Sequence, residues 1–115
     1  RLEMGEMNMI SINIHPYRTG ASKIFSGRDR GITVRIEKKL DEIDKSEEQV
    51  TVVIPKDTWT INSSFFGGLF EKSVMDLGRD KFLEKYTFVF DDGSGLSSEL
   101  RQNIEEGIHD ALNEI

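Results

Sequence analysis

Apolar residues alternate with polar ones near the start of the chain. Ile10, Ile12 and Ile14 are separated by single polar residues, and a period of two is typical of a strand with one buried face. The pattern predicts a strand over residues 7–14, which Pro16 ends because proline cannot donate a hydrogen bond to a neighbouring strand.

Two periods overlap in residues 29–45. Ile32, Val34 and Ile36 alternate as in a strand, but the apolar spacing from Ile32 onward also fits a helix. Residues 37–45 are helix formers with no glycine or proline among them. We therefore predict one helix over residues 29–45.

Further elements follow at regular intervals. Residues 50–54 are almost continuously apolar, which predicts a strand buried on both faces of a parallel or mixed sheet, with helices around it. Glycine is common directly after a helix, so Gly78 marks a helix end. The predicted elements are a strand over 49–54, a turn at 56–58, a helix over 63–77, a strand over 86–90, a turn at 91–95 and a last helix with Leu96, Leu100, Ile104, Ile108, Ala111, Leu112 and Ile115 on one stripe.

Strands and helices thus alternate along the chain. This order predicts an α/β fold with a small mixed sheet flanked by helices. The length of 115 residues predicts a single domain over residues 1–115. Residues 1–6 show no clear period, and we expect a disordered end or a non-native remnant there.

Composition narrows the classes of function. The net charge of −6 argues against binding to nucleic acid, which requires clustered lysine and arginine, and against an anionic membrane surface. The absence of cysteine excludes disulfides, thiolate nucleophiles and cysteine-based metal sites. It also fits the cytoplasm, which we expect as the location.

The most informative segment joins the strand at 49–54 to the helix at 63–77. Asn62, Ser63 and Ser64 open that helix, where free backbone N–H groups and the helix dipole favour a negative charge. One interpretation is helix capping by a serine hydroxyl. The other is a phosphate, either bound at the helix N-terminus or covalently attached to a serine.

Gly67 and Gly68 lie inside the same predicted helix, where each costs about 1 kcal/mol relative to alanine. They indicate close packing against the sheet or another helix, or a flat face that a partner backbone can approach. Of the neighbouring Phe65, Phe66 and Phe70, we expect two in the core and one partly exposed.

Arg28 and Arg30 stand close together in an acidic chain. One interpretation is a solvated loop with local ion pairs, and the other is a site that grips a carboxylate or phosphate. A turn explains Asp91 and Asp92 better than a magnesium site does.

No combination of residues in the sequence indicates catalysis. His15 and His109 are the only two histidines and lie on different predicted elements, so no Ser–His–Asp arrangement is recognisable. Trp59 and Phe25 fit ordinary core or edge packing. We therefore expect a protein that is not an enzyme and has no cofactor or metal.

Several segments together resemble the STAS-like domain family of unknown function, over about residues 20–115. The segments that carry the resemblance are 25–28 (Phe-Ser-Gly-Arg), 52–54 (Val-Val-Ile), 62–65 (Asn-Ser-Ser-Phe), 68–70 (Gly-Leu-Phe), 77–78 (Leu-Gly), 85–88 (Lys-Tyr-Thr-Phe) and 104–108 (Ile-Glu-Glu-Gly-Ile).

STAS domains proper are anti-sigma-factor antagonists and the cytosolic tails of sulphate transporters. In the antagonists, an Asp-Ser-Ser-Gly turn opens a helix, and a partner kinase of the GHKL ATPase type phosphorylates its first serine. Phosphorylation releases the kinase. The resemblance therefore implies a bacterial regulatory module that binds a protein partner and is not an enzyme.

On this chain the resemblance implies that Ser63 is the phosphoacceptor, with Asn62 in place of the aspartate and Phe65 in place of the glycine. It implies a GHKL-type partner bound by the surface around these residues and the Gly67-Gly68 pair.

The alternative is a domain that binds a small anionic ligand or a nucleotide. The helix N-terminus at Ser63 and Ser64 would then supply anion contacts together with Arg28 and Arg30. The sequence leaves the oligomeric state open.

Overall fold

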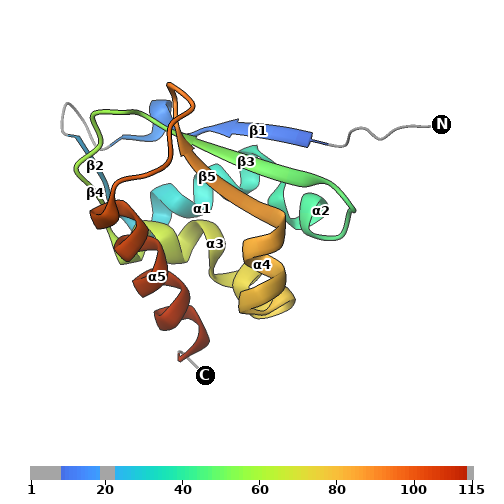
Figure 1. The fold of residues 1–115 in the computed structure, drawn as a ribbon. Helices are drawn as coiled ribbons and strands as arrows, with labels where there is room; N and C mark the ends of the chain where they lie inside the picture. Colours follow the sequence, from blue (N-terminus) through green and yellow to red (C-terminus); the bar gives the residue numbers. More distant parts are fainter. Residues whose placement is uncertain (1–8, 19–22, 114–115) are drawn as a thin grey trace.

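Figure 1 shows the fold in a computed structural model, which describes residues 9–18 and 23–113. Three parallel strands form the main sheet in the order β1 (Met9–Asn13), β3 (Gln49–Ile54) and β5 (Tyr86–Phe90). The α/β class is confirmed. The prediction of a mixed sheet is wrong, because the strands of the main sheet pair in parallel. The predicted start of the first strand at residues 7 and 8, and the predicted end segment 1–6, lie outside the described residues.

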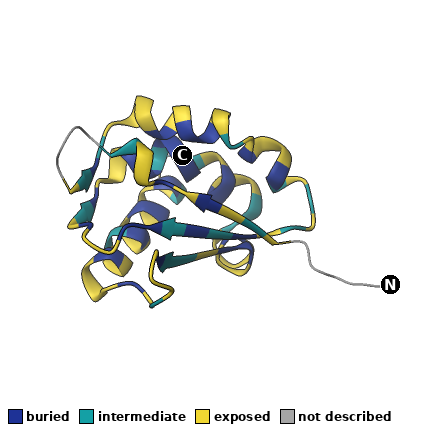
Figure 2. Ribbon diagram, turned by 90° about the horizontal axis from the view of Figure 1, so that it is seen from above, coloured by how far each residue is buried: buried dark blue, intermediate teal, exposed yellow. Residues whose placement is uncertain are grey.

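The helices pack on one face of this sheet, and no described helix covers the other (Figures 1 and 2). This follows from topology, because right-handed crossovers between strands in sequential order all pass over the same face. The expectation that β3 is buried on both faces is therefore wrong: Val50, Val52 and Ile54 are buried, whereas Thr51 and Val53 are only half-buried. The helical elements are η2 (His15–Tyr17), α1 (Arg28–Glu37), α2 (Leu40–Asp44), α3 (Ser63–Leu77), α4 (Arg79–Lys85) and α5 (Ser98–Leu112).

The single helix predicted over residues 29–45 is in fact two, α1 and α2. The chain breaks at Lys39, which has a left-handed backbone with φ of 58°. The break turns Leu40 and Ile43 into the core. Helix formers alone could not predict it, because tertiary burial of these two side chains overrides local propensity.

A short parallel pair of strands, β2 (Ile24–Phe25) and β4 (Thr60–Ile61), was also not predicted from the sequence. Each strand leads into a helix, β2 into α1 and β4 into α3. The N–H of Asn62 donates to the carbonyl oxygen of Phe25 at 2.8 Å. The N-termini of α1 and α3 are thereby held side by side.

α1 and α3 approach closely at two glycines. A Cβ atom added to Gly68 would lie 2.1 Å from the Arg28 carbonyl oxygen, and one added to Gly31 would lie 2.2 Å from the Phe65 carbonyl oxygen. Packing against another helix therefore explains Gly68. The expectation that one of Phe65, Phe66 and Phe70 is partly exposed is wrong, since all three are at most 2 % exposed.

A buried polar cluster ties α2 to this core. Arg35 is 8 % exposed and donates to the Leu69 carbonyl oxygen and the Ser73 hydroxyl, both at 2.9 Å. It also pairs with Asp44 at 3.1 Å, and Asp44 accepts hydrogen bonds from the hydroxyls of Ser73 and Tyr86. Each buried polar group of the cluster thus has a partner, as burial requires.

Tyr86 sets an alkaline limit to stability. Its burial and its hydrogen bond to Asp44 raise the pKa of Tyr86 well above its ordinary value of 10.0. The folded state therefore holds the phenol proton more tightly than the unfolded state, so this stability is complete below about pH 10 and is lost as the pH rises further. We expect the free energy of unfolding to fall by about 1.4 kcal/mol per pH unit above about pH 10. Urea denaturation from about pH 9 to 11 measures it. Tyr17 is the control, because its hydrogen bond to Glu37 also raises the pKa of its phenol but lies at the surface. The Tyr17→Phe variant should therefore keep most of the loss, and an unchanged free energy of unfolding in the unsubstituted chain would contradict the assignment to Tyr86.

Candidate functional site

Asn62 is the residue that caps α3. Its side-chain oxygen accepts hydrogen bonds from the backbone N–H of Ser64 at 2.8 Å and from the Ser64 hydroxyl at 2.5 Å. The interpretation of a serine as the cap is therefore wrong, because the amide of Asn62 already fills that role. Asparagine is among the preferred N-cap residues for this reason.

Ser63 is the first residue of α3, and it is exposed. Within the described part of the chain, its hydroxyl has no hydrogen-bond partner. The cap engages its neighbour Ser64 instead. Ser63 is thus an accessible hydroxyl at the positive end of a helix dipole.

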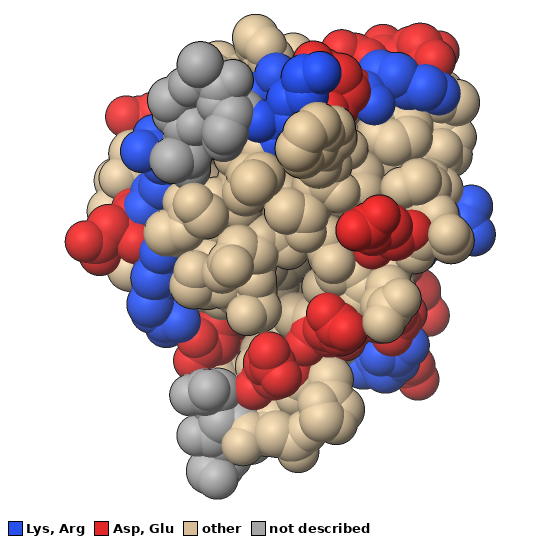
Figure 3. Space-filling view, turned by 90° about the vertical axis from the view of Figure 1, so that its left-hand side faces the viewer, with Lys and Arg blue, Asp and Glu red and all other residues tan. Residues whose placement is uncertain are grey.

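A cavity of about 230 Å³ lies beside the two serines. Figure 3 shows the face of the molecule that lies on the left in Figure 1, where charged side chains of both signs surround a mainly uncharged surface. Arg28 reaches it from the start of α1, and its guanidinium pairs with Glu71 of α3 at 2.7 Å. The structure therefore brings Arg28 and Ser63 together. The residues that line the cavity are Arg28, Ser63, Ser64, Gly67, Glu71, Gly107, Asp110 and Ala111.

Arg30, in contrast, does not line this cavity. Its guanidinium donates instead to the carbonyl oxygen of Arg18 at 3.4 Å. The two arginines are close in the sequence but contact different parts of the molecule, because residues two apart on a helix point in different directions.

The charges around the cavity disfavour a free anion. One cation, Arg28, faces two carboxylates, Glu71 and Asp110. The helix dipole offers a bound anion about 0.3–1 kcal/mol at an exposed site, and Arg28 is already paired with Glu71. A phosphate attached covalently to Ser63 does not depend on such affinity, so the geometry fits a modified serine better than a free ligand.

Two of the predicted contact residues are not available to a partner. Phe65 is 1 % exposed and packs against Phe25, with ring centroids 5.3 Å apart. Ser63 is exposed although Phe65 follows it closely in the sequence. Gly68 is buried against α1, whereas Gly67 is half-buried beside the Arg28 guanidinium. The surface around Ser63 is therefore formed by Asn62, Ser64, Gly67 and Arg28 among the predicted residues.

The acidic residues after β5 form a turn, as predicted. Asp92 accepts hydrogen bonds from the hydroxyl and backbone N–H of Ser94, which lower the pKa of Asp92 to about 2. Asp91 accepts from the backbone N–H of Lys56 at 3.2 Å. Within the described residues, no group of three histidine or acidic side chains is placed to hold a metal ion.

Trp59 does not lie in the core. Its side chain is 66 % exposed, and the Lys23 ammonium lies 5.7 Å from the ring centroid. Phe25, by comparison, is fully buried, as expected.

Sequence reasoning missed the two carboxylates of the cavity. Glu71 is one helical turn after Gly67, so helical spacing could have indicated it. Asp110 comes from α5, which packs on α3 where Gly107 lets Phe66 approach closely. No local pattern predicts that meeting.

Replacing Asn62 by alanine is expected to lower the free energy of unfolding by about 1 kcal/mol, since the backbone N–H of Ser64 loses its cap. Urea denaturation measures the change. The matched Ser64→Ala variant removes the exposed hydrogen bond from the Ser64 hydroxyl to Asn62 but keeps the backbone cap, and it is expected to stay within about 0.5 kcal/mol. Equal losses in the two variants would contradict the assignment of Asn62 as the cap.

No helix among the described residues is long and apolar enough to span a membrane.

The comparisons with known proteins leave the family open. Comparison of the chain with models of known protein families, with curated proteins and with solved structures finds no match.

Proposed function

We propose that this chain is a regulatory, non-enzymatic STAS-like module of the cytoplasm. It binds a GHKL-type ATPase or kinase through the surface around Ser63, and phosphorylation of Ser63 switches that binding. The observation that carries the proposal is the exposed Ser63 hydroxyl, which has no hydrogen-bond partner in the described part of the chain. Asn62 and Ser64 satisfy each other and leave it accessible.

A phosphate on Ser63 would change the local charge sharply. It adds about −1.5 to −2 at pH 7, next to a surface that already carries Glu71 and Asp110. Arg28 is the nearby cation that could pair with the phosphate, at the expense of its 2.7 Å pair with Glu71. Both the added charge and a new pairing of Arg28 change the surface that a partner contacts. A partner with an acidic or apolar face would therefore be released.

The test compares the two serines. The chain is incubated with the candidate kinase and ATP, and phosphorylation is mapped by mass spectrometry on the unsubstituted chain, Ser63→Ala and Ser64→Ala. We expect modification of the first and third chains only. Binding to the partner should weaken at least tenfold in Ser63→Asp. The control, Ser64→Asp, should weaken it less. No modification of the unsubstituted chain, together with unchanged binding by Ser63→Asp, refutes the switch.

A second candidate is a site for a small anion or nucleotide, in which Arg28 beside Ser63 would exchange its pair with Glu71 for the ligand. Thermal denaturation in the presence of phosphate and nucleotides tests it, since a bound ligand raises the midpoint as its concentration exceeds the dissociation constant. An Arg28→Gln variant should lose that shift. Unchanged midpoints at millimolar ligand exclude this candidate.

A further inference from the structure

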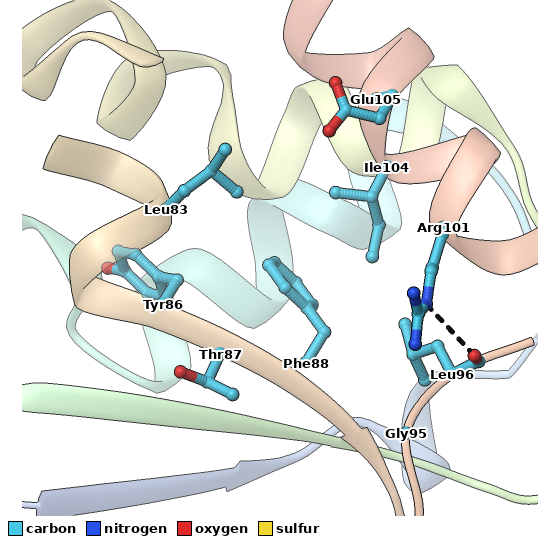
Figure 4. A pocket seen from close by; sticks show the side chains of 9 residues that line it. All are labelled: Leu83, Tyr86, Thr87, Phe88, Gly95, Leu96, Arg101, Ile104 and Glu105. Atoms are coloured by element: carbon cyan, nitrogen blue, oxygen red, sulfur yellow. Dashed lines mark hydrogen bonds between the residues drawn. The ribbon is translucent and has the colours of Figure 1, made fainter. Parts of the chain in front are cut away.

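A second cleft, of about 330 Å³, lies between β5, α4 and α5 (Figure 4). α5 packs mainly against α3 and β4, so it stands away from the edge of the main sheet. Phe88 of β5 and Ile104 of α5 point into the space between them, and Leu83 of α4 borders it. The cleft is thus bounded mainly by apolar side chains.

Both ends of the cleft are closed along β5. At one end, the Phe90 N–H donates to the Ser94 carbonyl oxygen at 2.9 Å, and Val89 forms a bridge with Gly95. At the other end, α4 runs directly into β5. The open edge spans at most Tyr86–Phe88, which is short beside the five or six residues of an ordinary strand. A compact ligand fits this space better than an added strand.

A cation stands at the border of the cleft. The Nε–H of Arg101 donates to the Leu96 carbonyl oxygen at 3.2 Å, which fixes the guanidinium beside the opening (Figure 4). No carboxylate of the described residues lies within ion-pair distance of Arg101. Glu105, the acidic residue that lines the cleft, pairs with Arg79 at 2.7 Å. Arg101 is thus an uncompensated positive charge beside an apolar space.

We propose that this cleft binds a small apolar carboxylate. The apolar body lies against Phe88, Ile104 and Leu83, and the carboxylate accepts hydrogen bonds from the free terminal nitrogens of Arg101. A guanidinium suits a carboxylate because it can offer two parallel N–H donors. The cavity volume is at the lower end of the range for small-molecule sites, which selects a compact ligand. This site is independent of Ser63 and of the function proposed for it.

The test is a titration of the ¹⁵N-labelled chain with phenylacetate, followed by NMR. We expect saturable shifts confined to residues around the cleft, with a dissociation constant of about a millimolar or tighter. Phenylacetamide has the same shape without the charge and should bind about tenfold more weakly. Arg101→Gln should weaken phenylacetate binding about tenfold and remove the preference over the amide. Arg30→Gln, a matched change of an arginine outside the cleft, should leave both affinities unchanged.

The comparison of acid and amide uses the unsubstituted chain, so it decides the matter even if Arg101→Gln fails to fold. Equal affinities for the two probes, shifts that do not saturate, or shifts centred on Ser63 would overturn the proposal. None of these outcomes bears on whether a kinase modifies Ser63.

Discussion

Replacing Arg35 by methionine is expected to lower the free energy of unfolding by about 3–5 kcal/mol, the cost of leaving a buried charge without its partner. Arg35 is 8 % exposed, and the side chain of Asp44 is 6 % exposed. Without the guanidinium, Asp44 remains buried with only the hydroxyls of Ser73 and Tyr86 as donors. The Leu69 carbonyl oxygen loses a donor as well. Because small domains are stable by about 5–15 kcal/mol in total, a change of this size threatens folding.

Two further variants separate the charge effect from lost packing. Arg79→Met removes an arginine from an exposed pair with Glu105 and is expected to cost less than about 1 kcal/mol. The double variant Arg35→Met with Asp44→Asn removes both buried charges, so it should be more stable than Arg35→Met alone. All are measured by urea denaturation. A loss in Arg35→Met no larger than that in Arg79→Met would contradict the role of the buried cluster.

Local patterns predicted most of the main elements in their order, although they predicted no element at α4 (Arg79–Lys85). β3, α3, β5 and the Gly78 helix end all occur where the apolar spacing and the glycine place them. The break at Lys39 could not be predicted, because its cause is the burial of Leu40 and Ile43 against distant residues. The strand pair β2 and β4 could not be predicted for a similar reason, since each strand is only two residues long and forms only by pairing with the other.

The candidate site, too, could be predicted only in part from the sequence. Local sequence predicts that residues 62–64 open a helix, and it predicts the helix dipole at Ser63. It could not decide which side chain caps the helix, because Asn62, Ser63 and Ser64 all have suitable acceptors. Nor could it bring Arg28 to Ser63. That approach depends on the close packing of α1 on α3, which requires glycine at both contact points.

Replacing Gly68 by alanine is the second large effect that we expect, with a loss of about 3 kcal/mol in the free energy of unfolding, at the upper end for overpacking. The added Cβ would lie 2.1 Å from the Arg28 carbonyl oxygen and 3.0 Å from the Ile32 nitrogen. Both are backbone atoms of α1, so no side-chain rotation relieves the clash. α1 must move away from α3, and Arg28 moves with it.

The neighbouring Gly67 provides the matched control. A Cβ added there would lie 3.0 Å from a terminal nitrogen of Arg28, the far end of a flexible and exposed side chain. A small shift relieves that contact, and alanine gains up to about 1 kcal/mol of helix propensity over glycine. Gly67→Ala should therefore be as stable as the unsubstituted chain or slightly more so. Because the two variants add the same methyl group to adjacent positions of α3, urea denaturation of both isolates the helix contact. Equal stabilities would show that α1 and α3 do not meet at Gly68.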